Sequence, residues 1–173
     1  MLLKLTGAAL TIGACGFYGL AGARRFNDRI RHLKSVRFAL TILEREVTYI
    51  HNPLPLALEK VVALAEPPAR QLFAETSRCL SLKGDYTAEE SWRQGVAALG
   101  SASALLPEDL ELLNSFAPRL GMSDVDEQIK CFQMLVEELK LQEAKAAQVA
   151  DSGRRIWSYG GFLLGALIVL LVI

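Results

Sequence analysis

The feature that most constrains how this chain can fold is its C-terminal stretch, residues 123–173, which changes character along its length. It opens with Ser123 and acidic residues, where a hydroxyl can cap free backbone N–H groups and carboxylates favour the positive end of a helix dipole. Apolar residues then recur at steps of four and three: Val125, Ile129, Phe132, Val136 and Leu139. From residue 156 onward no charged residue occurs. The pattern predicts one long helix that begins in water and ends in a membrane.

The uncharged run at residues 156–173 is close to the roughly 20 residues that cross about 30 Å of hydrocarbon. Trp157 and Tyr159 stand at its start, and Arg154 and Arg155 precede it. Aromatic rings and guanidinium groups favour the lipid headgroup region at such positions. The alternative is a buried core helix, but a run with no polar face is not typical of one. We therefore expect a C-terminal transmembrane helix over residues 156–173.

A second charge-free run, residues 5–23, lies near the N-terminus. It has three interpretations: a retained transmembrane helix, a cleaved signal peptide, or a lipoprotein signal at Cys15. The lipoprotein interpretation is weak because apolar sequence continues past Cys15, where a polar tether is expected. Cleavage after Ala23 stays open, since residues 20–23 form a small-x-small site.

Basic residues flank the inner end of both runs, namely Arg24, Arg25, Arg29 and Arg31 at one and Arg154 and Arg155 at the other. The positive-inside rule places the region between them in the cytoplasm, with both termini on the opposite side of the membrane. A secreted domain would leave these arginines on the wrong side. The charge pattern therefore favours a retained anchor over residues 1–23.

For the region between the anchors, residues 24–155, the sequence pattern predicts one helical domain. Its first helix carries an apolar stripe at steps of three and four: Leu33, Val36, Leu40, Leu43, Val47 and Ile50. The Asn-Pro-Leu-Pro sequence at residues 52–55 ends this helix, because proline lacks a backbone donor and disfavours helical geometry before it. The stripe matches that of the C-terminal helix, so the two could pair antiparallel as a stalk with the other helices on its distal part.

Local start and stop signals predict the remaining helices. Two come after the first stop, over about residues 54–65 and 68–82, the second with Leu72, Phe73 and Leu80 as its expected core. Thr87 and Glu90 form a capping box, which predicts a helix that buries Trp92, Val96 and Leu99. Pro107 starts a further helix that ends near Pro118. No strand-like alternation occurs, so the expected fold class is all-α: a bundle of about six helices on an antiparallel long-helix stalk, with N- and C-terminal transmembrane helices.

Motifs for catalysis or cofactor binding are missing from the sequence. It contains neither a phosphate-binding loop nor a dinucleotide fingerprint. The acids nearest to His32 and His51, the only histidines, are Asp28 and Glu46, which are expected on a solvated helix and not as ligands of a metal. Cys79 and Cys131 are interpreted as small buried apolar residues. The formal net charge of +0 gives no support to nucleic-acid binding. We expect no enzymatic activity, cofactor or metal.

One short motif joins a glycine helix stop to a capped helix start. It consists of five residues at a corner of the chain: Leu120, Gly121, Ser123, Asp124 and Gln128. With the Pro-rich stop at residues 52–55, the basic flank and the two terminal runs, it makes the whole chain resemble the stage III sporulation protein AB family of spore-forming bacteria.

This resemblance implies a function. Proteins of that family are similar to the cytoplasmic domain of the type II secretion inner-membrane platform protein. The resemblance implies a non-enzymatic platform subunit of a secretion-like sporulation channel, held in the mother-cell membrane that faces the forespore. Its partners would be the lipid bilayer, other channel subunits, a secretion-type ATPase (stage III sporulation protein AA) and, as a homo-oligomer, further copies of the chain. The five corner residues are then candidate partner-binding residues, with structural capping as the alternative role.

Two other functions fit the residues without the resemblance. One is a membrane-anchored helical regulatory or signalling domain unrelated to secretion. The other is a secreted helical binder of lipid or peptide, which requires that the first apolar run is removed as a signal.

Overall fold

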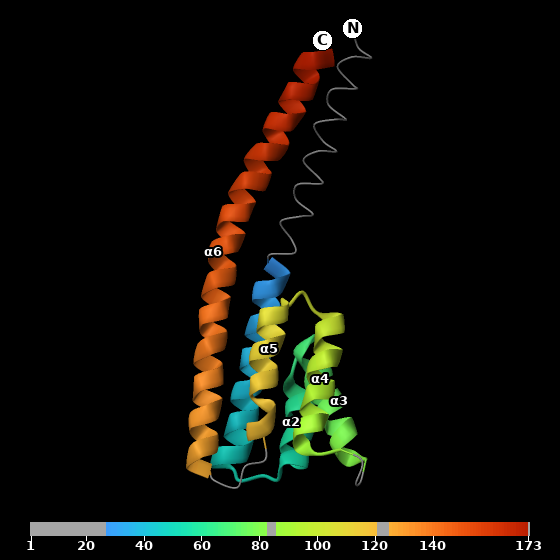
Figure 1. The fold of residues 1–173 in the computed structure, drawn as a ribbon, viewed down its shortest axis with the longest axis vertical. Helices are drawn as coiled ribbons and strands as arrows, with labels where there is room; N and C mark the ends of the chain where they lie inside the picture. Colours follow the sequence, from blue (N-terminus) through green and yellow to red (C-terminus); the bar gives the residue numbers. More distant parts are fainter. Residues whose placement is uncertain (1–26, 83–85, 121–124, 173) are drawn as a thin grey trace. The chain divides into compact units, whose positions relative to one another are not determined.

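The computed structural model describes residues 27–82, 86–120 and 125–172, the side chains of residues 125–126 and 153–172 excepted. Every element in these ranges is helical (Figure 1). A helix over residues 27–44 leads into the π-helical turn η1, and further helices come after it. Their bounds are η1 Arg45–Tyr49, α2 Leu54–Leu64, α3 Ala69–Ser81, α4 Ala88–Ala102, α5 Pro107–Ser115, the 3-10 turn η2 Ala117–Arg119, and α6 Val125–Val172. For the described residues, the predicted all-α class with six α-helices is confirmed.

The chain divides into two compact units. One is Arg29–Ala144; the other joins Met1–Asp28 to Lys145–Ile173. The predicted soluble domain, residues 24–155, extends beyond the Arg29–Ala144 unit at both ends. The hydrogen bonds and ring contacts that position the candidate site lie within the Arg29–Ala144 unit.

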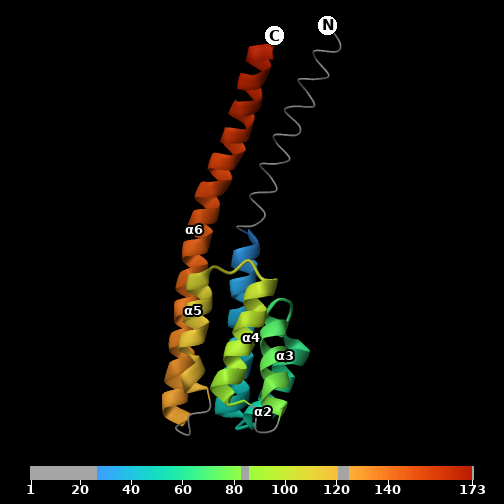
Figure 2. The ribbon, with the colours of Figure 1, turned by 45° about the vertical axis from the view of Figure 1, so that its right-hand side comes forward.

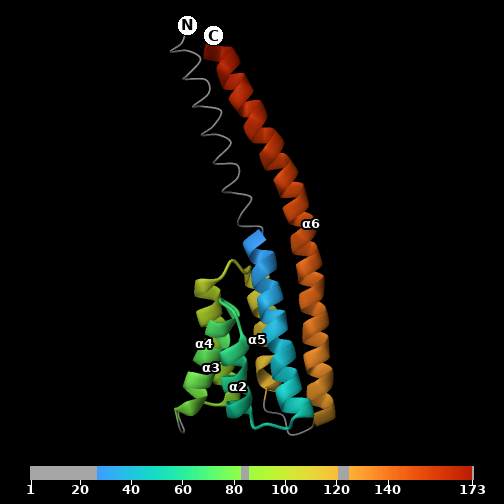
Figure 3. The same ribbon diagram turned by 180° about the vertical axis from the view of Figure 1, so that it is seen from behind.

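The two long helices of this unit pack antiparallel, as the sequence predicts. Arg37 Nε donates to Glu143 Oε1 across the pair at 2.5 Å. Both helices bury apolar residues at alternating steps of three and four: Leu33, Val36, Leu40 and Leu43 on one, and Phe132, Leu135 and Leu139 on the other. Figure 3 shows the helix of residues 27–44 beside the first part of α6. This seam is the antiparallel stalk that the sequence pattern predicts, but on α6 the buried stripe differs from the predicted one: Leu135 is buried, whereas Ile129 and Val136 are only half-buried.

The three middle helices pack on one another, α3 against both α2 and α4 (Figure 2). Gly95 of α4 makes the α3–α4 approach close: a Cβ there would overlap the Thr76 hydroxyl and lie 2.5 Å from the Leu72 carbonyl oxygen. A line of aromatic rings then connects these helices to α6. The centroid distances are 5.8 Å for Phe73–Trp92, 5.6 Å for Trp92–Phe116 and 4.8 Å for Phe116–Phe132. The core is thus continuous from α3 to α6.

A buried ion pair ties α5 to the start of the first long helix. Arg29 Nε and Nη2 donate to the two carboxylate oxygens of Asp109, each at 2.9 Å. The Asp109 side chain is 0% exposed and that of Arg29 is 12% exposed. Asp109 Oδ2 also accepts from the backbone N–H of Leu106 at 2.9 Å, so it caps α5 as well. We call Arg29, Asp109 and Leu106 the proximal latch.

The proximal latch sets how far the bundle reaches along the stalk. The sequence pattern predicts that the remaining helices pack on the distal part of the stalk. In the structure α5 begins beside Arg29, at the first residue of the unit, where the buried Asp109 carboxylate is paired with a cation. The bundle therefore runs along the whole length of this unit.

Several predicted helix ends are confirmed. The Thr87 hydroxyl accepts from the Glu90 N–H at 3.2 Å, and Glu90 Oε2 accepts from the Thr87 N–H at 2.8 Å. Trp92, Val96 and Leu99 of this helix are buried, and so are Cys79 and Cys131. Leu80, expected in the core, is only half-buried.

Within the described part of the chain, no helix combines the length and hydropathy that crossing a membrane requires. The first predicted span, residues 1–23, lies outside the described residues. The second, residues 156–173, falls on the last part of α6, where the backbone is helical to Val172 but side chains are not described. Both spans stay predictions.

Candidate docking surface

The end of the Arg29–Ala144 unit opposite the proximal latch has an unusual backbone. The first long helix widens there into η1, with Ile50 N–H donating to the Arg45 carbonyl at 3.1 Å, a spacing of five residues. Next, His51 has a φ of 59°, in the left-handed region that non-glycine residues rarely adopt. Single π turns and left-handed non-glycine residues both occur often at functional sites. We call residues 45–56 the distal end.

A carboxylate braces the distal end from inside. Glu46 Oε2 accepts from Asn52 Nδ2 at 2.6 Å and from Lys60 Nζ at 2.9 Å. The Asn52 N–H also donates to the Glu46 carbonyl at 2.9 Å. The hydrogen bond from Lys60, helped by that from Asn52, lowers the pKa of Glu46. Glu46, in the turn that ends the first long helix, thus links the Asn-Pro sequence to α2.

The π turn explains why one member of the predicted stripe is misplaced. Regular α spacing would continue the stripe through Val47 to Ile50, but a π turn holds more residues and rotates the next part of the chain about the helix axis. Glu46 and Thr48 are buried instead, and the Thr48 hydroxyl donates to the Glu44 carbonyl at 2.6 Å. Ile50 is 44% exposed. The expectation of a buried Ile50 is therefore wrong.

The result is an apolar surface on a braced support. Tyr49 is 69% exposed and Leu56, at the start of α2, is 43% exposed. With Ile50 they place three large apolar side chains within eight residues of chain. Tyrosine is among the residues enriched at the centre of protein interfaces. Sequence reasoning missed this surface because only the π turn exposes Ile50.

The corner residues lie only partly within the described chain. Leu120 is 3% and Gln128 5% exposed, so both side chains pack inside the unit in this structure. Gly121, Ser123 and Asp124 lie outside the described residues. Leu120 and Gln128 flank the corner and serve its packing, so partner binding by this motif would rest on the other three.

The described residues show no arrangement for catalysis. Within those ranges no three His, Cys, Asp or Glu side chains are grouped to hold a metal ion. His32 Nδ1 accepts from the Ala104 N–H at 2.9 Å, which gives this ring a structural role. Burial raises the pKa of the Cys79 thiol, which disfavours the nucleophilic thiolate. The absence of enzymatic activity stays a prediction.

Known proteins agree with the resemblance that the sequence motifs indicate. The model of the family "Stage III sporulation protein AB" matches residues 4–173. A curated relative, stage III sporulation protein AB of Bacillus subtilis (strain 168), is 30% identical over 171 residues, which cover 99% of each chain. A solved structure of a stage III sporulation protein AB is similar with a TM-score of 0.66 at 30% identity, covering 72% of this chain and 97% of that one. The chain therefore belongs to the stage III sporulation protein AB family.

Proposed function

We propose that this protein is a non-enzymatic, membrane-anchored platform subunit of a secretion-like sporulation channel between mother cell and forespore. It docks a secretion-type ATPase and other channel subunits, and the distal end carries the docking surface. Two terminal helices hold the Arg29–Ala144 unit at the bilayer. The family membership supports the sporulation part of this proposal.

The observation that carries the docking proposal is the exposure of Tyr49 and Ile50 on a braced turn. Exposing large apolar side chains together is unfavourable in water, and such groups mark interaction surfaces. The turn that exposes these side chains is held in place, because Glu46 accepts hydrogen bonds from both Asn52 and Lys60. A surface that is apolar and preorganised loses little entropy when it binds a partner.

Its place within the unit also fits a platform. The unit begins and ends at Arg29 and Ala144, the two points from which the chain continues toward the predicted spans. The antiparallel pairing of Arg37 with Glu143 puts both points at one end and η1 at the other. The proposed docking surface thus lies at the end of the unit away from the two points where the chain enters and leaves it.

The test is co-purification of the full-length chain with stage III sporulation protein AA of the same organism, in detergent. We expect the wild type to retain the ATPase and the double variant Tyr49→Asp/Ile50→Asp to lose it. Phe38→Asp is the matched control, because Phe38 is also exposed (60%) on the same long helix but outside the distal end. Equal loss in both variants would contradict docking at this end.

Two further outcomes separate the alternatives. If the wild type retains neither the ATPase nor a channel subunit, the platform role is wrong and the regulatory interpretation is favoured. The intact mass of the mature protein tests the anchor: a chain without residues 1–23 would show a cleaved signal and favour the secreted binder.

A further inference from the structure

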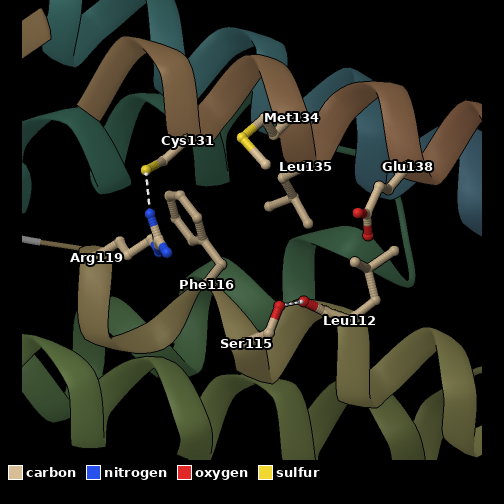
Figure 4. Close-up of a pocket in the computed structure, with 8 residues that line it drawn as sticks. All are labelled: Leu112, Ser115, Phe116, Arg119, Cys131, Met134, Leu135 and Glu138. Carbon is tan, nitrogen blue, oxygen red and sulfur yellow. Dashed lines mark hydrogen bonds between the residues drawn. The ribbon is translucent and has the colours of Figure 1, made fainter. Parts of the chain in front are cut away.

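We infer that a groove between α5 and α6 binds an amphipathic helix of a partner protein, one that carries an acidic and a basic residue two turns apart. Figure 4 shows the groove. It has a volume of about 170 Å³ and is lined by residues of α5, η2 and the first part of α6. None of its lining residues belongs to the distal end. A negative binding result at one of the two surfaces therefore does not contradict binding at the other.

The middle of the groove is apolar. Leu112 and Phe116 line it from one side, and Met134 and Leu135 from the other (Figure 4). Phe116 and Leu135 are buried, whereas Met134 is 62% exposed. The one hydroxyl in the lining, Ser115 Oγ, already donates to the Leu112 carbonyl at 2.7 Å. An occupant here gains from apolar contact and finds no hydroxyl in need of a partner.

The two ends of the groove carry opposite charges. Arg119 stands at one end, where Nη1 lies 3.0 Å from Cys131 Sγ. Glu138 stands at the other end (Figure 4). Within the described ranges Glu138 has no ion pair. Arg119 hydrogen-bonds to the weakly accepting Cys131 thiol and has the Glu127 carboxylate as a charged neighbour, with which it forms no ion pair in the described part of the chain. Both charges can therefore pair with an incoming partner.

The shape of the groove fits a helix as its occupant. A furrow between two packed helices accepts the side-chain ridge of a third, and amphipathic helices dock in such grooves through residues at i, i+3 and i+4. Cys131, beside Arg119, and Glu138 are seven residues apart on α6, which is about 10 Å at roughly 1.5 Å per residue. A partner helix matches this span with opposite charges at i and i+7 and apolar residues between them.

The experiment uses the full-length chain in detergent and three hydrocarbon-stapled helical peptides of about 16 residues. All carry two leucines on one face. The first peptide has Lys and Glu seven residues apart on either side of them; the others have Lys at both positions or Glu at both. We expect the Lys/Glu peptide to bind about tenfold more tightly than the other two in fluorescence anisotropy. Equal affinity for the three would overturn the inference.

Two variants of the protein locate the binding. Met134→Asp should weaken binding of the Lys/Glu peptide about tenfold, since it puts a charge into the apolar contact. Leu141→Asp is the matched control, because Leu141 is equally exposed (62%) on α6 but does not line the groove. Equal weakening by the two substitutions would contradict binding in the groove.

A change of groove charge then tests the pairing. Arg119→Glu leaves an acidic residue at both ends and should shift the preference to the Lys/Lys peptide. If that variant unfolds, Glu138→Lys serves in its place, because Glu138 is exposed, and should shift the preference to the Glu/Glu peptide. An unchanged order of affinities in the folded variant would refute the charge match.

Discussion

The two ends of the helical stretch formed by residues 27–44 and η1 differ in which side chains they bury and which they expose. At the proximal latch, Arg29 and Asp109 bury their charges and satisfy each other with two hydrogen bonds. At the distal end, Tyr49 and Ile50 leave apolar surface in water, on a strained turn. Burying charge demands a paired geometry, so the latch favours one conformation. Exposed apolar surface adds nothing to the stability of the free chain, which is why the proposed docking site is placed at the distal end.

The largest effect is expected at the latch. Arg29→Ala leaves the Asp109 carboxylate buried without its cation, and breaking a buried pair in this way costs about 3 kcal/mol or more. We expect a loss of unfolding free energy of that order, measured by urea denaturation of the full-length chain in detergent.

The control for that variant is Glu108→Gln. Glu108 also accepts from Arg29 Nη2, at 2.8 Å, but its side chain is 58% exposed. An exposed ion pair contributes at most about 1 kcal/mol. Similar losses in both variants would show that burial does not distinguish the latch.

The latch also shows what the sequence could not reveal. Helix ends were predictable because their signals are local: Thr87 and Glu90 are three residues apart, and Pro53 acts on its neighbours. Arg29 and Asp109 are 80 residues apart. The charge pattern assigns Arg29 to a basic flank beside the membrane, whereas its guanidinium pairs inside the domain. A long-range pair leaves no periodic pattern.

The distal end was predictable only in part for a related reason. The Pro-rich stop is local and was predicted. The π turn before it is accompanied by hydrogen bonds from Asn52 and Lys60 to Glu46, which hydrophobic periodicity cannot predict. Three of the five corner residues lie outside the described chain, so their candidate role in partner binding is still a prediction.

A smaller loss is expected from Glu46→Gln at the distal end. Glutamine keeps the shape of the side chain but removes the negative charge that Lys60 contacts. It also carries an NH2 donor in place of one of the accepting carboxylate oxygens. We expect a lower melting temperature at neutral pH, with a smaller change than in Arg29→Ala. Release of the turn should also raise the hydrogen-exchange rate of the Asn52 amide.

The pH dependence of this effect has a defined sign. The folded-state pKa of Glu46 lies below its ordinary value, so its stabilisation is complete above the unfolded pKa of about 4.3. The stabilisation is lost as the pH falls through the lower folded pKa. Wild type and Glu46→Gln should therefore converge in melting temperature as the pH falls below about 4.3, the unfolded pKa. A difference that stays constant as the pH falls below that value would contradict the charge-based brace.

The strain at His51 predicts a modest gain. Glycine adopts a φ of 59° without the Cβ clash, which costs other residues roughly 1 kcal/mol. We expect His51→Gly to raise the unfolding free energy by about 0.5–1 kcal/mol. His51→Ala is the matched control, because it removes the same ring but keeps the clash. A gain in both variants would assign the effect to the ring.

The smallest effect on stability is expected at the apolar surface itself. Tyr49→Ser and Ile50→Ser remove exposed side chains, so the unfolding free energy should change by less than about 0.5 kcal/mol each. Phe38→Ser should behave alike. A loss near that of Arg29→Ala would show that Tyr49 or Ile50 serves folding, and the contrast between the two ends would disappear.

The most direct test of docking at the distal end is site-specific photo-crosslinking in sporulating cells. A benzophenone amino acid replaces Tyr49 in one strain and Phe38 in another, since both side chains are exposed on one helical stretch. We predict that the Tyr49 position forms a cross-link to the secretion-type ATPase or a channel subunit, identified by mass spectrometry, and that the Phe38 position does not. Cross-links from Phe38 alone, or from neither position, would contradict docking at the distal end.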